Sequence, residues 1–490
     1  TCALPICIRK TDAEMRINME KKNTWETYSS KQLKELEKIN AQYRDFLDNG
    51  KTERECIDTI VNTIEKSGYR ELESLIKEGA ALKTGDKVYS VWMNKSIAMF
   101  QIGRKPMTDG MNILGAHIDS PRLDVKQNPL YEDGGFAYLD THYYGGVKKY
   151  QWVTIPLAIH GVIVKKDGTC VEINIGENED DPVFFVSDLL IHLAQEQLEK
   201  KAAKVIEGEA LDIIVGNKPL LIDKKDKKKD EKEAGKEAVK AGVLDILKET
   251  YDIHEEDFVS AELEIVPAGK AREAGFDRSM TLAYGQDDRV CAYTSMQAML
   301  DSDVTDRTMC CILVDKEEIG SVGATGMQSH FFENAVAEVM NLAGEYSELN
   351  VRRCLAHSCM LSSDVSSAFD PTYASSFDKR NVAYLGGGMV INKFTGARGK
   401  SGSNDANAEY LAHLRHIFDK AEVNFQTAEL GKVDLGGGGT IAYILALYGM
   451  NVIDSGVAVL NMHAPWEATS KADVYEAYRG YKAFVEGASL

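Results

Sequence analysis

Residues 309–323 read MCCILVDKEEIGSVG, and this stretch determines which type of fold the chain can adopt. Its apolar half, residues 309–314, predicts a buried strand, and Glu317 and Glu318 stand together just beyond the carboxyl end of that strand. Adjacent side chains at the end of a strand point in different directions, so one acid could bind a metal ion while its neighbour handles a proton. In open α/β sheets, ligands collect at the carboxyl ends of strands. The glutamate pair is therefore the first candidate for a functional site.

The composition is that of a large acidic globular protein. A chain of 490 residues is long enough for two or three domains. The 76 acidic and 57 basic side chains give a formal net charge of −19, which argues against a nucleic-acid partner. No apolar run reaches about 18 residues, so no membrane-spanning helix and no membrane partner are expected. The nine cysteines include no Cys-x-x-Cys pair, and we expect a reduced, cytoplasmic protein.

The first residues differ from the rest of the chain. Residues 1–18 contain Cys2 and Cys7 but lack the charged, apolar and small-residue regions of a signal peptide. A more ordinary segment begins at Met19. We therefore expect the natural start to lie near Met19 and residues 1–18 to be a leader or an artificial addition.

The spacing of apolar residues predicts an α/β sheet built from both ends of the chain. Residues 29–48 and 52–67 have the spacing of amphipathic helices, and residues 87–102 alternate like strands. From about residue 280 onward, helices and strands take turns, which is typical of an α/β fold. In addition to residues 309–314, strands are expected at 111–118, 355–363 and 452–460, and helices at 291–298, 326–340, 404–420, 440–448 and 472–488.

A different composition begins after Asp124. Residues 131–164 are rich in Gly, Tyr and β-branched residues, which predicts a small β-domain. Residues 183–198 are expected to return to helix, and residues 260–268 alternate again like a strand. Residues 218–240 are dense in Lys, Asp and Glu, which is typical of a solvated loop or an exposed helix.

These segments predict one domain interrupted by another. The catalytic α/β domain is expected to combine residues 19–124 with residues 279–490. The β-rich insert is expected at residues 125–278, with its charged loop near residues 218–240. Strand ends from both parts of the α/β domain would then meet in one sheet.

Five short stretches place metal-type ligands at the ends of predicted elements. The first, GAHIDSP at residues 115–121, puts His117 and Asp119 two residues apart on one face of a strand. In that position Asp119 could orient the imidazole of a metal ligand. A His-x-Asp pair is common, however, and taken alone it is more often structural.

The other four stretches also have ordinary explanations when each is taken alone. Asp287, in QDDR at residues 286–289, opens a predicted helix and could be its N-cap. The glutamate pair could face solvent, and Asp364 could belong to a turn after its strand. His463, in NMHAPWE at residues 461–467, could be a buried histidine with satisfied hydrogen bonds.

Taken together, the five stretches form a more specific set. Two divalent ions that share a bridging carboxylate need one His and one acid each, plus the shared Asp. One further acid remains to act as general base on a metal-bound water. No Gly-x-Ser-x-Gly nucleophile elbow stands out. The glycine run at residues 436–439 lacks the P-loop lysine and spacing, so close packing or contact with the substrate backbone is favoured there.

In this order, the five stretches resemble the aspartyl aminopeptidase family, which includes vacuolar aminopeptidase I and its bacterial relatives. The similarity runs from about residue 33 to residue 484. Its most specific parts are GAHIDSP, the sequence DKEEIGS at residues 315–321, and the Met-His pair at residues 462–463. The resemblance implies a three-layer α/β/α dizinc exopeptidase domain with an inserted, mainly β dimerisation domain. It also implies a homo-oligomer, a tetrahedral dodecamer built from dimers.

The resemblance implies a metal ligand set. His117 and Asp364 would complete one zinc site, and Glu318 and His463 would complete the other. Asp287 would bridge the two ions. Zinc suits these ligands, although manganese and cobalt also fit imidazole and carboxylate donors.

The resemblance also implies catalytic roles. Glu317 would be the general base. Asp119 would contact His117 and orient it without binding the metal ion itself. In this family the peptide bond between the bridging aspartate and its successor, here Asp287 and Asp288, tends to be cis.

Two departures from the family affect the substrate side. Eukaryotic members have a histidine that reaches a neighbouring subunit's site, and Asp188 stands in its apparent place. A family lysine that meets acidic side chains follows a Val-Ile pair, which here is followed by Asn392 and then Lys393. A solvated basic loop is the alternative reading of the lysines. The candidate substrate contacts are Asp188, Lys393, Lys400 and Gly438.

The expected function is a zinc metallo-aminopeptidase that acts on peptides with a free N-terminus. A metal-bridging water would attack the peptide bond, with Glu317 as base. The preferred N-terminal side chain would be acidic or neutral and leucine-type. The alternatives are a dizinc amidohydrolase or deacetylase acting on a small non-peptide amide, and a non-enzymatic scaffold. The complete ligand set argues against the scaffold.

Overall fold

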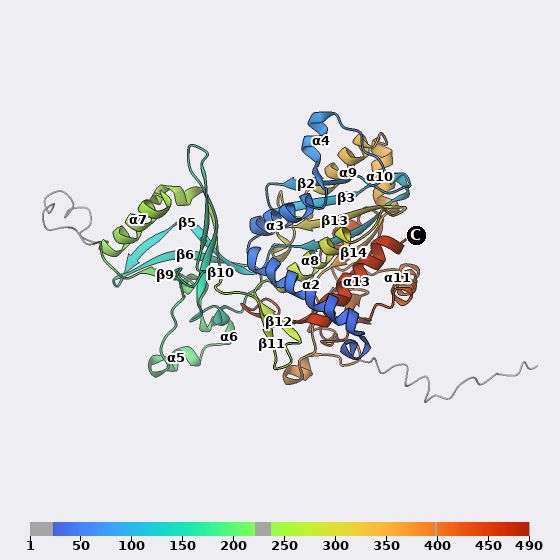
Figure 1. The fold of residues 1–490 in the computed structure, drawn as a ribbon. Helices are drawn as coiled ribbons and strands as arrows, with labels where there is room; N and C mark the ends of the chain where they lie inside the picture. The colour runs from blue at the N-terminus through green and yellow to red at the C-terminus, as the bar shows by residue number, and fades with distance from the viewer. Residues whose placement is uncertain (1–22, 221–236, 397–398, 490) are drawn as a thin grey trace, which may run out of the picture.

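The computed structural model describes residues 23–220, 237–396 and 399–489, and its strands form three sheets. A nine-stranded mixed sheet has the order β1-β2-β3-β13-β4-β14-β18-β16-β17. A six-stranded sheet has the order β8-β7-β10-β5-β6-β9, and a five-stranded sheet the order β11-β12-β20-β19-β15. Figure 1 shows the six-stranded sheet and helix α7 (Ala238–Tyr251) as a body beside the larger α/β part.

Strand β13 (Thr308–Val314) lies in the middle of the large sheet. It pairs in parallel with β4 (Met111–His117) and antiparallel with β3 (Ser96–Gln101). Next to β4 lies β14 (Cys359–Ser363), and next to that β18 (Asn451–Gly456), both parallel. Four neighbouring strands therefore run in one direction, and their carboxyl ends meet at one edge of the sheet. The other strands of this sheet are β1 (Arg70–Glu71), β2 (Lys87–Trp92), β16 (Met389–Asn392) and β17 (Phe425–Thr427).

Two apolar cores cover the two faces of this sheet, which explains why β13 is apolar from Met309 to Val314. Met309, Cys311 and Leu313 belong to one core, while Cys310 and Ile312 belong to the other. A strand buried on both faces has no reason to alternate. The first core holds α2 (Ser30–Asn49), α3 (Glu53–Glu65), α8 (Gln286–Leu300), α11 (Ala408–Lys420) and α13 (Lys471–Gly487). The second holds α4 (Leu72–Glu78), α9 (Phe331–Leu342), α10 (Glu348–His357) and α12 (Ala442–Ala446).

The six-stranded sheet is antiparallel throughout and has its own core. That core includes Trp152, Leu157, Ile213 and Ile265, and residues of α7 pack against it. The sheet consists of β5 (Arg122–Asp133), β6 (Phe136–Tyr144), β7 (Leu157–Val164), β8 (Cys170–Ile175), β9 (Ile213–Gly216) and β10 (Ala261–Pro267). These strands lie in or next to the region predicted to be the β-rich insert.

The five-stranded sheet joins the start of α8 to the C-terminal part of the chain. Its strand β12 pairs with β20, and Lys471 at the end of β20 begins α13. The sheet contains β11 (Arg272–Ala274), β12 (Met280–Ala283), β15 (Ser366–Ser367), β19 (Ala458–Leu460) and β20 (Glu467–Ser470).

The helix predicted at residues 183–198 is wrong. Only a 3-10 turn, η4 (Ile191–Leu193), and one turn of helix, α5 (Gln195–Leu198), form there. The backbone of Phe184 instead exchanges two hydrogen bonds with Leu157, of 2.8 and 2.9 Å, and Phe185 accepts one from Ile214. Pairing with the edge of the small sheet therefore overrides the local helical pattern.

Two predicted strands have different boundaries in the structure. The strand predicted at residues 355–363 begins at Cys359, because Leu355 is still in α10. The strand predicted at residues 452–460 is two strands, β18 and β19, which join different sheets. At the junction a Cβ on Gly456 would lie 1.8 Å from the Asp364 carbonyl oxygen, so only glycine fits there.

Further differences concern helix α11, which begins at Ala408 rather than at residue 404, helix α9, and the parts of the chain outside the described residues. Helix α9 begins at Phe331 rather than at residue 326. The proposed leader at residues 1–18 lies outside the described residues, as do residues 221–236 of the charged segment. Across the described ranges, no helix combines the length and apolarity needed to cross a membrane.

Candidate metal centre

The predicted metal-type residues come together at the carboxyl edge of the parallel strands. Five different elements, or the segments next to them, supply these six residues. His117 ends β4, Asp287 lies in the first turn of α8, Glu317 and Glu318 form the short 3-10 helix η7 (Glu317–Ile319) after β13, Asp364 follows β14, and His463 lies between β19 and β20.

Asp287 lies between the two histidines. Its Oδ1 is 3.2 Å from Nε2 of His117, and its Oδ2 is 3.2 Å from Nε2 of His463. Burial would raise the pKa of the Asp287 carboxyl, but the hydrogen bonds and charges of the two histidines lower it well below its usual range. The structure shows no side-chain cap on α8, so the N-cap explanation of Asp287 is wrong. The Asp287–Asp288 peptide bond is cis, as the resemblance implies.

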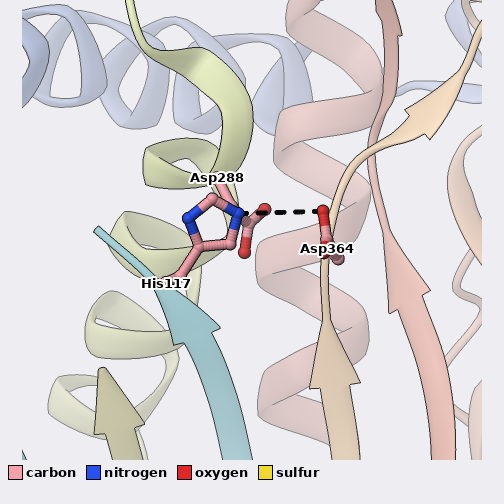
Figure 2. A group of neighbouring side chains, drawn as sticks. All are labelled: His117, Asp288 and Asp364. Carbon is pink, nitrogen blue, oxygen red and sulfur yellow. Dashed lines mark ion pairs between the residues drawn. The ribbon is translucent and has the colours of Figure 1, made fainter. Parts of the chain in front are cut away.

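A second carboxylate approaches each histidine. Oε1 of Glu318 is 3.3 Å from Nε2 of His463, and Oδ1 of Asp364 is 4.0 Å from Nε2 of His117. Figure 2 shows His117 and Asp364 facing each other, with Asp288 beside them. Ligand atoms of His117, Asp288 and Asp364 lie within 4.8 Å of one another, as do those of His117, Asp287 and Glu318. Each histidine thus has its own carboxylate in addition to the shared one.

Buried Asp119 connects His117 to the glutamate pair. Nδ1 of His117 lies 3.0 Å from the Asp119 carbonyl oxygen and 3.2 Å from its Oδ1. The backbone N–H groups of Glu317 and Glu318 donate to the two oxygens of the same carboxylate, both at 3.1 Å. One fixed carboxylate therefore sets the position of the first histidine and of both glutamates.

Glu467 connects Asp287 to His463 in a similar way, and sequence reasoning gave it no role. Its Oε1 accepts a hydrogen bond from the His463 backbone at 2.7 Å, and its Oε2 accepts one from the Asp287 backbone at 3.0 Å. His463 has a φ of +65°, which is unusual for a non-glycine residue. The signal was present in the quoted stretch NMHAPWE, where an acid stands four residues after the histidine.

The site carries more negative charge than its histidines can balance. Burial raises the pKa of the Glu317 carboxyl to about 7, with Asp119 and Asp287 adding to the effect and His117 opposing it. Burial and neighbouring carboxylates also raise the pKa values of Glu318 and Asp364 well above the usual range. Buried carboxylates in such excess are stabilised by bound cations.

The donor set therefore fits divalent metal ions. Imidazole and carboxylate donors suit zinc. Both side-chain oxygens of buried Asp288 have no hydrogen-bond partner among the described residues, as expected of a carboxylate beside a cation site. Asp288 was not predicted to be part of the site. Asp287 was predicted to be part of it, and the position of Asp288 next to Asp287 is the feature of the sequence that could have indicated it.

A cavity of about 630 Å³ opens beside these carboxylates. Gly438 lies on its wall, within the glycine run that was predicted to approach the substrate. Asp454, which sequence reasoning missed, also lines the cavity and accepts a 2.5 Å hydrogen bond from Thr440. Among the other lining residues are Asn392, Leu430, Tyr443 and Met462.

The structure does not bring the other three predicted substrate contacts into this cavity. Nζ of Lys400 is 2.7 Å from Asp405, and Nζ of Lys393 is 3.9 Å from the same carboxylate, so one acid engages both lysines. Lys400 also lies 4.0 Å from the ring centroid of Phe394. Asp188 is exposed and accepts a hydrogen bond from Gln197 in the small-sheet body.

The chain is similar to known aminopeptidases. Residues 46–485 match the family model described as aminopeptidase I zinc metalloprotease (M18). A curated relative from Clostridium acetobutylicum, named Probable M18 family aminopeptidase 1, is 63% identical over 466 residues, which cover 95% of this chain and 98% of the relative.

Solved structures have the same fold. A crystal structure of an M18 family aminopeptidase from Thermotoga maritima has a TM-score of 0.89 at 44% identity, covering 96% of this chain and 100% of that chain. A structure of the S. cerevisiae mApe1 dodecamer has a TM-score of 0.72 at 20% identity, covering 91% and 96% respectively, and this likeness concerns the fold alone.

Removing one histidine tests the ligand set. We expect His463→Ala to retain one firmly bound zinc ion in place of two, because His117, Asp287 and Asp364 remain. The measurement is the zinc content after dialysis, by elemental analysis. His142, which is exposed on the small sheet, provides the control, and His142→Ala should match the wild type. Full zinc loading of the His463→Ala protein would contradict the ligand set.

Proposed function

This chain belongs to the aminopeptidase I (M18) family and is a zinc metallo-aminopeptidase, and we propose that Asp287 is the shared ligand of two ions within it. The observation that carries this proposal is the position of Asp287, with each carboxylate oxygen 3.2 Å from a different histidine. His117 and Asp364 would hold one ion, and His463 and Glu318 the other. Zinc is the expected metal, with manganese and cobalt compatible with the same donors.

Glu317 is the proposed general base. It lines the cavity, and its Oε2 lies 4.0 Å from Nε2 of His117, too far for a hydrogen bond. When bound, the ions would make a shared water acidic and polarise the scissile carbonyl. Glu317 takes the proton from the attacking water and gives it to the departing amine. A carboxyl whose pKa is raised towards neutrality suits both halves of this transfer.

Carboxylates beyond those proposed to bind the ions also favour a substrate that has a free α-amine. Glu317 and Asp454 line the cavity without being proposed metal ligands, and a substrate ammonium group would be attracted to them. Such attraction favours removal of an N-terminal residue over cleavage within a chain. Membership of the family does not favour the alternative of an amidohydrolase or deacetylase.

We propose that the preferred N-terminal side chain is neutral. Leu430, Met462 and Tyr443 give the cavity apolar surface, and its charged lining residues within the described part of the chain are carboxylates and His463. The lining acids that are not proposed metal ligands, Glu317 and Asp454, would repel an acidic side chain. Of the two lysines that could offset this repulsion, Lys400 pairs with Asp405 at 2.7 Å, and Lys393 lies 3.9 Å from the same acid and outside the cavity lining.

We also propose a homo-oligomer, with the dodecamer of the S. cerevisiae relative as the expected assembly. The segment from residue 183 to residue 198 exposes an unusual number of large apolar side chains. Leu190 is 54% exposed, Ile191 66% and Leu193 67%. An apolar patch of this kind marks a protein–protein contact.

The general base is tested by Glu317→Gln. We expect kcat to fall at least about a hundredfold, because the amide cannot accept the water's proton. The variant should keep the wild-type zinc content, because Glu317 is not a proposed ligand. Glu338→Gln, at an exposed position on α9, is the matched control. Near-normal turnover by the Glu317→Gln protein would rule out this role.

The side-chain preference is tested with matched aminoacyl substrates. We expect kcat/KM to be at least about tenfold higher for an N-terminal leucine than for an N-terminal glutamate. Lys393→Met and Lys400→Met should leave this ratio unchanged, because Asp405 already engages both lysines. An N-acetylated leucine substrate should remain uncut. A preference for glutamate that either lysine substitution abolishes would show that the proposal is wrong.

The assembly is tested by analytical ultracentrifugation. We expect the wild-type protein to sediment as a dodecamer and the double variant Leu190→Asp/Leu193→Asp to form smaller species, because buried charge opposes the contact. Leu447→Asp is the control, since Leu447 is 80% exposed but lies on the α/β part. A wild-type monomer at micromolar concentration would contradict the proposal.

A further inference from the structure

We propose that the three residues ending and following β6, Tyr144, Gly145 and Gly146, position both metal-binding histidines. These residues belong to the predicted insert, so the insert would complete the active site of its own chain in addition to any role in assembly. The inference rests on the proposed metal ligands, and it adds positioning residues that none of the five sequence stretches contains.

Tyr144 acts on the first histidine through Asp119. Its hydroxyl donates a 2.8 Å hydrogen bond to Oδ2 of Asp119, and the Asp119 carboxylate and carbonyl lie 3.2 and 3.0 Å from Nδ1 of His117. Asp119 is fully buried and Tyr144 is 8% exposed. The hydroxyl therefore fixes the carboxylate that keeps Nε2 of His117 turned towards Asp287. Hydrogen-bond partners behind a metal ligand set its orientation and tautomer.

The ring of Tyr144 is itself held in place by Arg122. The Arg122 guanidinium carbon lies 3.9 Å from the ring centroid, a cation–π contact. Its NH1 donates to Glu53 of α3 at 2.7 Å, and its Nε donates to Asp124 at 2.8 Å. This ion-pair cluster joins the small sheet to the helical layer of the large one. Tyr144 therefore links Asp119 to the small sheet, and the orientation of the Asp119 carboxylate depends on where that sheet lies.

Gly146 acts on the second histidine directly. Its carbonyl oxygen lies 3.0 Å from Nδ1 of His463. Because a carbonyl only accepts, Nδ1 donates its proton to Gly146, and Nε2 is the nitrogen that faces Asp287. The two histidines are thus oriented by consecutive parts of one short turn.

The glycines are needed for this close approach. A Cβ on Gly146 would lie 3.2 Å from Nδ1 of His463. Gly145 has a φ of +74°, and a Cβ there would lie 3.4 Å from the side chain of Glu318. A larger residue at position 146 would push on His463, a proposed ligand, and at position 145 the positive φ itself favours glycine.

The test measures zinc affinity separately for the two ions, by competition of the metal-free protein with a chromophoric chelator. Tyr144→Phe removes the hydroxyl and keeps the ring over Arg122, so we expect one zinc to bind about 10- to 100-fold more weakly and the other to bind normally. Gly146→Ala should weaken the other zinc, and the double variant should weaken both. Tyr143→Phe, on the neighbouring exposed side chain, should match the wild type.

A purely structural role would give a different result. The metal-free Tyr144→Phe and Gly146→Ala proteins should keep a cooperative unfolding transition with only a small decrease in temperature, because each loses at most one local contact. Wild-type affinities for both ions in both variants would overturn the inference, as would loss of both ions together with the unfolding transition. If the wild-type protein itself fails to bind two zinc ions, the proposed function is what fails.

Discussion

The organisation of the site depends on one buried carboxylate placed between two imidazoles. Asp287 presents one oxygen to His117 and the other to His463, both at 3.2 Å, while further carboxylates gather around the pair. A cluster of buried acids is unfavourable unless cations balance it. Family membership supplies the expected cation, zinc, and the proposed role of Asp287 is to be shared by two such ions.

The fold meets this constraint by combining parallel strand ends with backbone hydrogen bonds. Strands β4, β13 and β14 deliver His117, the glutamate pair and Asp364 to one edge of the sheet. Two further acids then fix the backbone at the site. Asp119 accepts the N–H groups of both glutamates, and Glu467 accepts those of Asp287 and His463. The positions of the proposed ligands are therefore set by residues that contact the ligands and not the proposed ions.

The sequence was informative where a residue's role follows from its position along one strand. The apolar run of β13 predicted a buried strand, and the polar residues at strand ends predicted the edge where they meet. The contacts that depend on another part of the chain could not be predicted this way. Asp405 lies 2.7 Å from Lys400 and 3.9 Å from Lys393. The backbone of Phe184 forms hydrogen bonds with Leu157, where the local pattern predicted a helix. The contact between Gly146 and His463 spans more than three hundred residues, and no local pattern indicates it.

The central claim is that Asp287 is shared by two ions. Anomalous diffraction from zinc-loaded crystals, recorded on both sides of the zinc absorption edge, tests it directly. The account predicts two anomalous peaks, one on the His117 side of Asp287 and one on the His463 side, each within bonding distance of one carboxylate oxygen. A single peak, or two peaks of which only one contacts Asp287, would contradict it.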